Sequence, residues 1–152
     1  MGNICRSPSA EGFFSHHLSK SGIRDRVGTD SAGTHSYHLG YPPDSRAIAE
    51  AGRFGVDISA LRARRIKDSD FEQFDLILGM DHHNLSIIDA MRPEKSRADT
   101  GLMMDYEPAS GLEEVPDPYY GSQQDFKLMC DLLNEATRNL LVHLESKLEH
   151  KS

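Results

Sequence analysis

Six consecutive residues near the start of the chain, Gly2 to Ser7, have the composition of an anion-binding loop. They read Gly-Asn-Ile-Cys-Arg-Ser and are followed by Pro8. Backbone N–H groups at a helix N-terminus bind anions, and the Arg6 guanidinium can donate two hydrogen bonds to one phosphoryl group. The run is not a nucleotide-binding Walker loop, because it lacks the Gly-Lys-Ser/Thr ending of such a loop. The run indicates a phosphate site, although a bare Gly-Asn also fits an ordinary turn.

A second candidate segment lies far along the chain, at Val115–Tyr120. Asp117 stands there between two prolines. Proline restricts the backbone, so this loop is stiff, as suits a general acid that must reach into a site. The same residues also fit a surface turn. From this segment alone both interpretations stay open.

Alternating helices and strands are expected to position these segments. Ser7 can cap a first helix whose first residue is Pro8 and which ends at about residue 20. Asp44 can cap a second helix ending near residue 55, a third begins at Asp81, and the longest spans about 122–148. Strands are expected at about 27–31, at 74–78 and, more weakly, at 101–104, with 74–78 buried. This order predicts an α/β domain whose parallel sheet is covered on both faces.

Composition narrows the class of protein. The chain has 152 residues, of which 38% are hydrophobic and 27% charged, as in a single globular domain. A net charge of −7 argues against nucleic acid or an anionic membrane as a partner. No apolar stretch approaches the roughly 20 residues of a membrane span, and no export signal is recognisable. Two cysteines are too few for a disulfide framework and indicate the cytoplasm.

The histidines and the second cysteine are the residues that could serve as metal or redox groups. Neither a cysteine set nor a carboxylate set surrounds the paired histidines at ligand spacing. Exposed histidines are the simpler interpretation, and neither metal nor cofactor is expected. Cys130 falls on the apolar side of the last predicted helix, which favours a buried core thiol over a redox group.

Residues 2–12, GNICRSPSAEG, resemble the active-site loop and first helix of the low-molecular-weight protein tyrosine phosphatases. That family's loop reads Cys-x-Gly-Asn-x-Cys-Arg-Ser, within the wider Cys-x5-Arg motif. Further matches follow in family order over nearly the whole chain: Asp30–Thr34, Asp44–Arg46, Ala63-Arg64, Phe74–Ile77, Met80-Asp81 with Asn84, and Val115–Gly121. The resemblance implies one three-layer αβα domain over residues 1–152 with a four-stranded parallel sheet. It also implies hydrolysis of phosphotyrosine in proteins through a phosphocysteine intermediate.

The resemblance gives three residues catalytic roles. Arg6 would clamp the phosphoryl oxygens and stabilise their charge in the transition state. Ser7 would hydrogen-bond the nucleophilic thiolate and keep it ionised. Asp117 would protonate the leaving phenolate and later deprotonate the water that hydrolyses the phosphocysteine.

Other matched residues would bind the substrate or support the loop. The backbone N–H groups that would cradle the phosphate belong to Gly2, Asn3, Ile4, Cys5, Arg6 and Ser7. The rim around the phosphotyrosine ring would be lined by Tyr37, Tyr119 and Tyr120. Asn3 would brace the loop with Ser31 as a partner. Cys5 matches a cysteine that in relatives can form a reversible disulfide with the nucleophile.

The chain departs from the family pattern at its start. The nucleophile would stand immediately before Met1, and Cys5 cannot replace it because Glu11 holds the corresponding Arg position. The family's first, central strand would also precede Met1. We therefore expect the chain as written to fold poorly and to be inactive, with Met1 an internal methionine. A non-catalytic form that binds phosphorylated partners is the alternative, although such a form would not require Asp117.

Substrate class can also be argued from the resemblance. Relatives that act on phosphoarginine tend to carry Thr at the Ile4 position and to lack the paired tyrosines. Ile4 with Tyr119-Tyr120 therefore favours phosphotyrosine, with phosphoarginine as the alternative. Arsenate reductases of this fold need a further pair of redox cysteines, which is not found here. The expected partners are phosphotyrosine-containing proteins, and the expected state is a cytoplasmic monomer.

Overall fold

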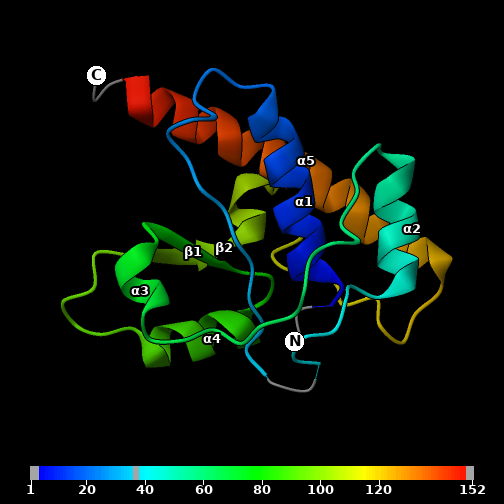
Figure 1. Cartoon of the computed structure of the whole chain (residues 1–152), viewed down its shortest axis with the longest axis horizontal. Coiled ribbons are helices and arrows are strands. Elements are labelled where there is room, and N and C mark those ends of the chain that lie inside the picture. The colour runs from blue at the N-terminus through cyan, green and yellow to red at the C-terminus, as the bar shows by residue number, and fades with distance from the viewer. Residues whose placement is uncertain (1–3, 36–37, 150–152) are drawn as a thin grey trace.

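A computed structural model describes residues 4–35 and 38–149. Three layers are visible, with α1, α2 and α5 on one side of a small sheet and α3 and α4 on the other (Figure 1). The elements in chain order are α1 Arg6–Ser19, α2 Ser45–Arg53, α3 Asp70–Gln73, β1 Leu76–Gly79, α4 His82–Met91, β2 Asp99–Leu102, the 3-10 helices η1 Met103–Tyr106 and η2 Pro108–Ser110, and α5 Gln123–Glu149. The α/β class expected from the sequence is confirmed.

Aspartates cap two helices through side-chain hydrogen bonds, and the cap predicted at Asp44 is confirmed. The Asp44 carboxylate accepts from the backbone N–H of Arg46 and begins α2. The Asp81 carboxylate accepts from the N–H of Asn84 and begins α4. An aspartate at this position satisfies an N–H group that would otherwise lack a partner within the helix. α5 also lies where its apolar spacing predicted.

The predicted cap of the first helix is wrong. Cys5, not Ser7, precedes α1, and its side chain makes no capping hydrogen bond. Ser7 is the second helical residue and Pro8 the third. Proline is tolerated there because the first N–H groups of a helix have no partner within it. The helix therefore starts earlier and places Arg6 at its very first position.

The sheet is smaller than the resemblance implies. Among the described residues it has two strands, β1 and β2, paired in parallel with Leu76 opposite Asp99. The strand expected at 27–31 is not formed, and within residues 4–35 and 38–149 no strand pairs with that segment. The third strand begins at Asp99, not at residue 101. Near this region Gly33 makes a single parallel bridge with Arg65.

β1 is half-buried along most of its length, although its sequence predicts a fully buried strand. The reason is a groove beside it that leaves three apolar side chains partly open to solvent. Elsewhere the core is closed, with Phe13, Phe126 and Leu133 at 1% exposure or less. None of the helices in the described residues combines the length and the apolar character that crossing a membrane requires.

Candidate active site

The loop that leads into α1 lies where the carboxyl end of β1 meets two other loops. The backbone N–H of Asp44 donates to the carbonyl of Ile4 at 2.7 Å, which ties the loop to the start of α2. Ile4, Cys5, Arg6 and Ser7 all line the groove beside β1. Gly2 and Asn3 lie outside the described residues. The part that is described places an arginine and a helix N-terminus at one end of a groove, as an anion site needs.

Arg6 is held in place by two hydrogen bonds although its side chain is 4% exposed. Its Nη1 donates to Asp81 Oδ2 at 2.8 Å and to the carbonyl of Val115 at 2.7 Å. Both bonds use the same nitrogen. Within the described part of the chain, Nε and Nη2 are therefore the edge that remains for a phosphoryl group.

Asp81 performs two tasks, since it caps α4 and pairs with Arg6. Burial raises the pKa of its carboxyl, but the Asn84 N–H and Arg6 outweigh burial and hold the pKa below its ordinary value. A charged Asp81 therefore orients the guanidinium. The sequence predicted that a helix begins at Asp81, but not the pairing of Asp81 with Arg6, 75 positions away.

The loop carrying Asp117 is anchored on both sides of that residue. Val115 and Pro118 are fully buried, and the Val115 N–H donates to the carbonyl of Met80 at 2.9 Å. Asp117 itself is exposed, lines the same groove as Arg6, and accepts a hydrogen bond from the Tyr119 N–H at 3.1 Å. The structure thus brings together the two segments that the sequence singled out separately.

Cys5 has the wrong environment for a nucleophile. It is 4% exposed, and burial, with smaller contributions from the charges of Asp44 and Asp117, raises its pKa to about 12. A reactive thiol needs the opposite shift, because the thiolate is the nucleophile. Cys130 is also buried, and burial raises its pKa to about 12 as well. The expectation of a core thiol at Cys130 is confirmed.

Ser7 and Ser31 both line the groove. Ser31 Oγ donates to Glu11 Oε1 at 2.6 Å, so its one hydroxyl proton is directed to that carboxylate. Burial of Glu11 raises its pKa, and the Ser31 hydrogen bond acts in the opposite direction. The predicted partner of Ser31, Asn3, lies outside the described residues. Glu11 as the partner of Ser31 was not foreseen from the sequence.

Aromatic side chains stand beside the loop of Asp117. Tyr119 and Tyr120 lie edge to face with 4.8 Å between ring centroids, and Tyr120 is 96% exposed. Arg46 positions them, because its Nη2 donates to the Tyr119 carbonyl at 2.8 Å and its guanidinium lies 4.5 Å from the Phe126 ring. Tyr37 lies outside the described residues. Arg46 belongs to a segment that matches the family, but no role was predicted for it. The structure supplies that role.

No set of three or more histidine, cysteine or carboxylate side chains at metal-binding distance occurs in residues 4–35 and 38–149. The histidines instead make ring contacts. His38 lies 6.0 Å from Tyr119 and 5.6 Å from Tyr41, centroid to centroid. His35 stacks on His83 at 6.1 Å.

Comparison with known proteins adds a family to this geometry. Residues 1–151 match the family described as low molecular weight phosphotyrosine protein phosphatase. A Synechocystis protein named as a low molecular weight protein-tyrosine-phosphatase is 41% identical over 97% of this chain and 94% of its own. A protein tyrosine phosphatase structure from Entamoeba histolytica has a TM-score of 0.92 and 35% identity, covering 97% of this chain and 94% of its own. A Drosophila arginine phosphatase structure has a TM-score of 0.85 and 28% identity, covering 95% and 93%.

Proposed function

The chain belongs to the low molecular weight phosphotyrosine protein phosphatase family, and we propose that its site hydrolyses phosphotyrosine through a phosphocysteine intermediate. One observation carries the proposal. Arg6, at the N-terminus of α1, and Asp117, on an anchored loop, line the same groove. A phosphoryl clamp and a proton donor are the two groups that displacement of a phenolate requires.

In the first step a thiolate attacks phosphorus and the bond from phosphorus to the tyrosine oxygen breaks. Asp117 gives its proton to the leaving oxygen, so tyrosine departs neutral. Nε and Nη2 of Arg6 stabilise the charge on the equatorial oxygens. Asp81 keeps the guanidinium oriented through Nη1.

In the second step water attacks the phosphocysteine. Asp117, now a carboxylate, takes a proton from that water, and the bond between sulfur and phosphorus breaks. Inorganic phosphate leaves, and the thiolate is restored. Ser7, at the start of α1, would hydrogen-bond this sulfur and favour its charged form.

The attacking thiolate is proposed to stand directly before Met1. Buried Cys5 is unsuited because its pKa is raised to about 12. We propose that the 152 residues alone do not turn over substrate. We propose that a longer chain is active, in which an apolar strand that ends in cysteine precedes Met1. This longer chain is called the extended chain. A non-catalytic phosphopeptide binder is the alternative.

Phosphotyrosine is the proposed substrate group. Tyr119 and the exposed Tyr120 offer an aromatic wall, which a phenyl ring can contact. Phosphoarginine is the second candidate, because the Drosophila arginine phosphatase has a similar structure. Ile4→Thr in the extended chain should raise phosphoarginine hydrolysis relative to phosphotyrosine hydrolysis if Ile4 contributes to the choice. The proposed partners are cytoplasmic phosphoproteins. The proposed state of the chain is a single-domain monomer.

Substituting the proton donor tests the mechanism. In the extended chain, Asp117→Asn should lower kcat for phenyl phosphate about 10²–10³-fold, because the phenolate would leave without a proton. The loss should be smaller for p-nitrophenyl phosphate, whose leaving group is stable as an anion. Steady-state kinetics with both esters measures the difference.

Glu114→Gln, on the same loop, is the matched control and should leave both rates unchanged. Glu114 is exposed, and its carboxylate accepts a hydrogen bond from the His82 N–H. Equal losses for the two esters in Asp117→Asn would show that Asp117 is not the proton donor.

A further inference from the structure

A row of four rings leads outward from the candidate active site. In order they belong to Tyr120, Tyr119, His38 and Tyr41, and neighbouring ring centroids lie 4.8, 6.0 and 5.6 Å apart. The first three residues line the groove that Asp117 also lines, and Tyr41 does not. This set is called the aromatic row, and it runs from the site to the outer surface.

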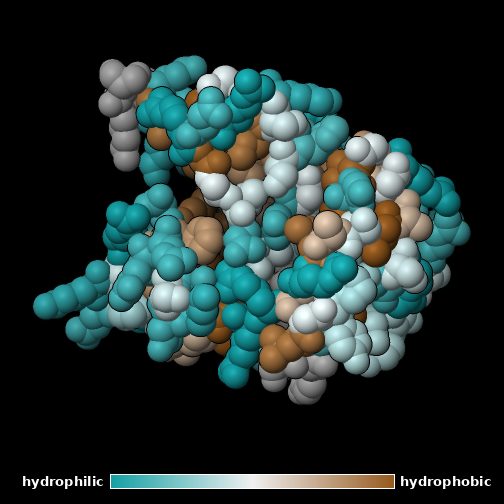
Figure 2. Space-filling view, in the orientation of Figure 1, coloured by the Kyte–Doolittle hydropathy of each residue, from teal (hydrophilic) through white to brown (hydrophobic). Residues whose placement is uncertain are grey.

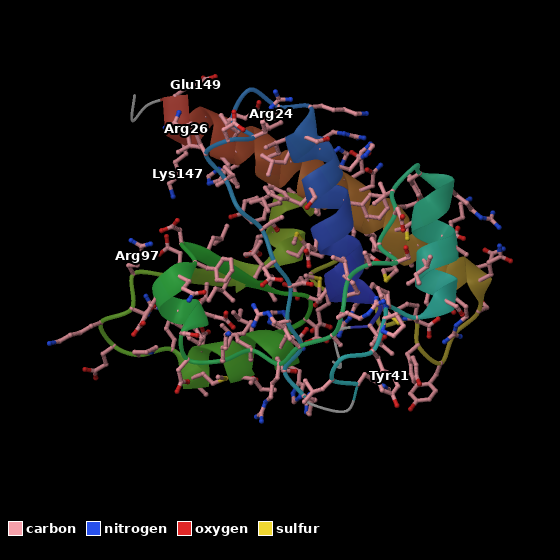
Figure 3. The ribbon with its side chains drawn as sticks, viewed as in Figure 1. Arg24, Arg26, Tyr41, Arg97, Lys147 and Glu149 are labelled. Atoms are coloured by element: carbon pink, nitrogen blue, oxygen red, sulfur yellow. The ribbon has the colours of Figure 1, made fainter. Side chains whose placement is uncertain are left out.

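Tyr41 forms the outer end of the aromatic row. Its side chain is 60% exposed, and Figure 3 shows it at the lower edge of the molecule, below α2. At this edge Figure 2 shows pale and apolar side chains next to one another. Leu39, two residues earlier in the same turn, is 52% exposed. Exposed apolar side chains that are scattered singly need no explanation, but Leu39, Tyr41 and Tyr120 gather around one site.

The backbone that carries Leu39 and Tyr41 is fixed. The Gly40 N–H donates to the Ala63 carbonyl, and the Ala63 N–H donates to the Tyr41 carbonyl, both at 2.8 Å. Within the turn, the Tyr41 N–H donates to the His38 carbonyl at 2.9 Å. Gly40 has a φ of 77°, which a residue with a side chain rarely adopts. A tyrosine on such a backbone offers contact area at little cost in conformational entropy.

The charges beside the aromatic row are already paired. Nη2 and Nε of Arg46 donate to the Asp44 carboxylate at 2.9 and 3.0 Å. The same guanidinium lies 5.8 Å from the centroid of the Tyr119 ring. Because its charge is balanced by Asp44, Arg46 adds little attraction for an acidic residue of a ligand. The aromatic row and Leu39 offer apolar area instead, which favours apolar side chains.

The substrate polypeptide is the chain that would cross this surface. A phosphotyrosine whose ring contacts Tyr119 and Tyr120 leaves its neighbouring residues at the mouth of the groove. Two residues of extended peptide span roughly 6.6 Å, which is close to each step from Tyr119 to His38 and from His38 to Tyr41. A side chain about two to four positions from the phosphotyrosine can therefore reach Tyr41.

We propose that Tyr41 and Leu39 form a second subsite, which binds an apolar side chain of the substrate about two to four positions from the phosphotyrosine. This inference rests on the proposed function, because the bound phosphotyrosine holds the polypeptide at the mouth of the groove. It also narrows the substrate class. Phosphotyrosine proteins with an apolar residue at this distance are hydrolysed in preference to those with a small polar or acidic residue there.

Phosphotyrosine peptides with one variable residue test the proposal. Leucine, serine or glutamate is placed in turn at each position about two to four residues before and after the phosphotyrosine, in an otherwise constant sequence. The extended chain supplies kcat/KM for each peptide. At one of these positions we expect leucine to exceed serine about five- to tenfold, as partial burial of an apolar side chain gives, and glutamate to match serine.

Substitutions of the two subsite residues test the assignment. Tyr41→Ala should bring the ratio of leucine to serine peptide close to one, whereas Tyr41→Phe should keep the ratio because the ring remains. Leu39→Ala should lower the ratio in part. Leu128→Ala is the matched control and should keep the ratio, since Leu128 is exposed on α5 and does not line the groove. A loss of folded protein would lower kcat/KM for both peptides equally and leave their ratio unchanged.

Three results would overturn the proposal. These are a ratio near one at every position, a ratio that Tyr41→Ala leaves intact, or a preference for glutamate over leucine. A dimer that Tyr41→Ala dissociates, with no peptide preference, would assign the aromatic row to a second copy of the chain instead.

Failure of the proposed function would look different, because the extended chain would then not turn over phenyl phosphate either. In that case the same peptides, with a non-hydrolysable phosphonate in place of the phosphate, decide the inference by their Kd. The leucine peptide should bind about five- to tenfold more tightly than the serine peptide. Equal binding of the two would overturn the subsite.

Discussion

At the scale of single residues, the site depends on how Arg6 is charged, buried and oriented. A buried guanidinium needs partners, since an unpaired buried charge is costly. Asp81 and the Val115 carbonyl satisfy one nitrogen and fix the plane of the group. A fixed planar fork binds two oxygens of a tetrahedral anion, which a flexible ammonium does less well.

Arg6→Lys in the extended chain should therefore lower kcat about 10²–10³-fold while the protein stays folded. The charge is kept, but the paired donors facing the phosphoryl oxygens are lost. Kinetics with a phosphotyrosine peptide measures the effect. Arg53→Lys, at an exposed residue that pairs with Glu50 at 3.3 Å, is the control and should change nothing. An Arg6→Lys variant as active as its parent would contradict the assigned role.

The two thiols should be inert in the folded 152-residue chain. With pKa values raised to about 12, only about one molecule in 10⁴ carries either thiolate at pH 8. Iodoacetamide at pH 8 should leave Cys5 and Cys130 unmodified while the chain unfolded in urea is labelled at both. Mass spectrometry of the digested protein gives the extent. Rapid labelling of Cys5 in the folded chain would remove the argument against it as nucleophile.

At the scale of elements, the sequence predicted those helix starts that depend on neighbouring residues alone. Asp44 was recognised as a cap because an aspartate followed by helical spacing satisfies the first N–H groups of a helix. Ser7 carried the same local signal, yet α1 begins at Arg6. The hydrogen bonds from Arg6 to Asp81 and Val115 come from distant segments, and no sequence window around Ser7 contains them.

The cap of α2 should contribute to stability in a pH-dependent way. The hydrogen bond from the Arg46 side chain, followed by its backbone N–H, outweighs burial and lowers the pKa of Asp44 from 3.8. A carboxylate whose pKa is lower when folded stabilises above about pH 3.8, and that contribution is lost as pH falls through the folded value. Asp44→Asn keeps a capping oxygen and removes the charge. It should cost stability at pH 7 and progressively less below pH 3.8.

Asp44→Ala removes the cap as well and should cost about 1 kcal/mol more than Asp44→Asn at pH 7. Urea unfolding at pH 7 and at pH 3 compares the three proteins. A gap between the parent and Asp44→Asn that widens toward pH 3 would contradict the assigned sign.

At the scale of the whole molecule, strand prediction failed where pairing is decided by distant residues. Residues 27–31 have strand-like composition but form no strand, since a strand exists only with a neighbour. β1 has the sequence of a buried strand but is half-buried, because the groove lies beside it. Arg6 and Asp117 were singled out in the sequence by their types, and both line the same groove. The contacts of Glu11, Arg46 and Asp81 were not predicted, because those contacts join segments far apart.

Turnover of a phosphotyrosine peptide by the extended chain, with either cysteine or serine directly before Met1, tests the central claim most directly. With cysteine we expect steady release of phosphate and, on acid quenching, a phosphoryl group on that cysteine. With serine, and with the 152-residue chain, we expect none. Equal turnover with serine, or a phosphoryl group found on Cys5, would contradict the account.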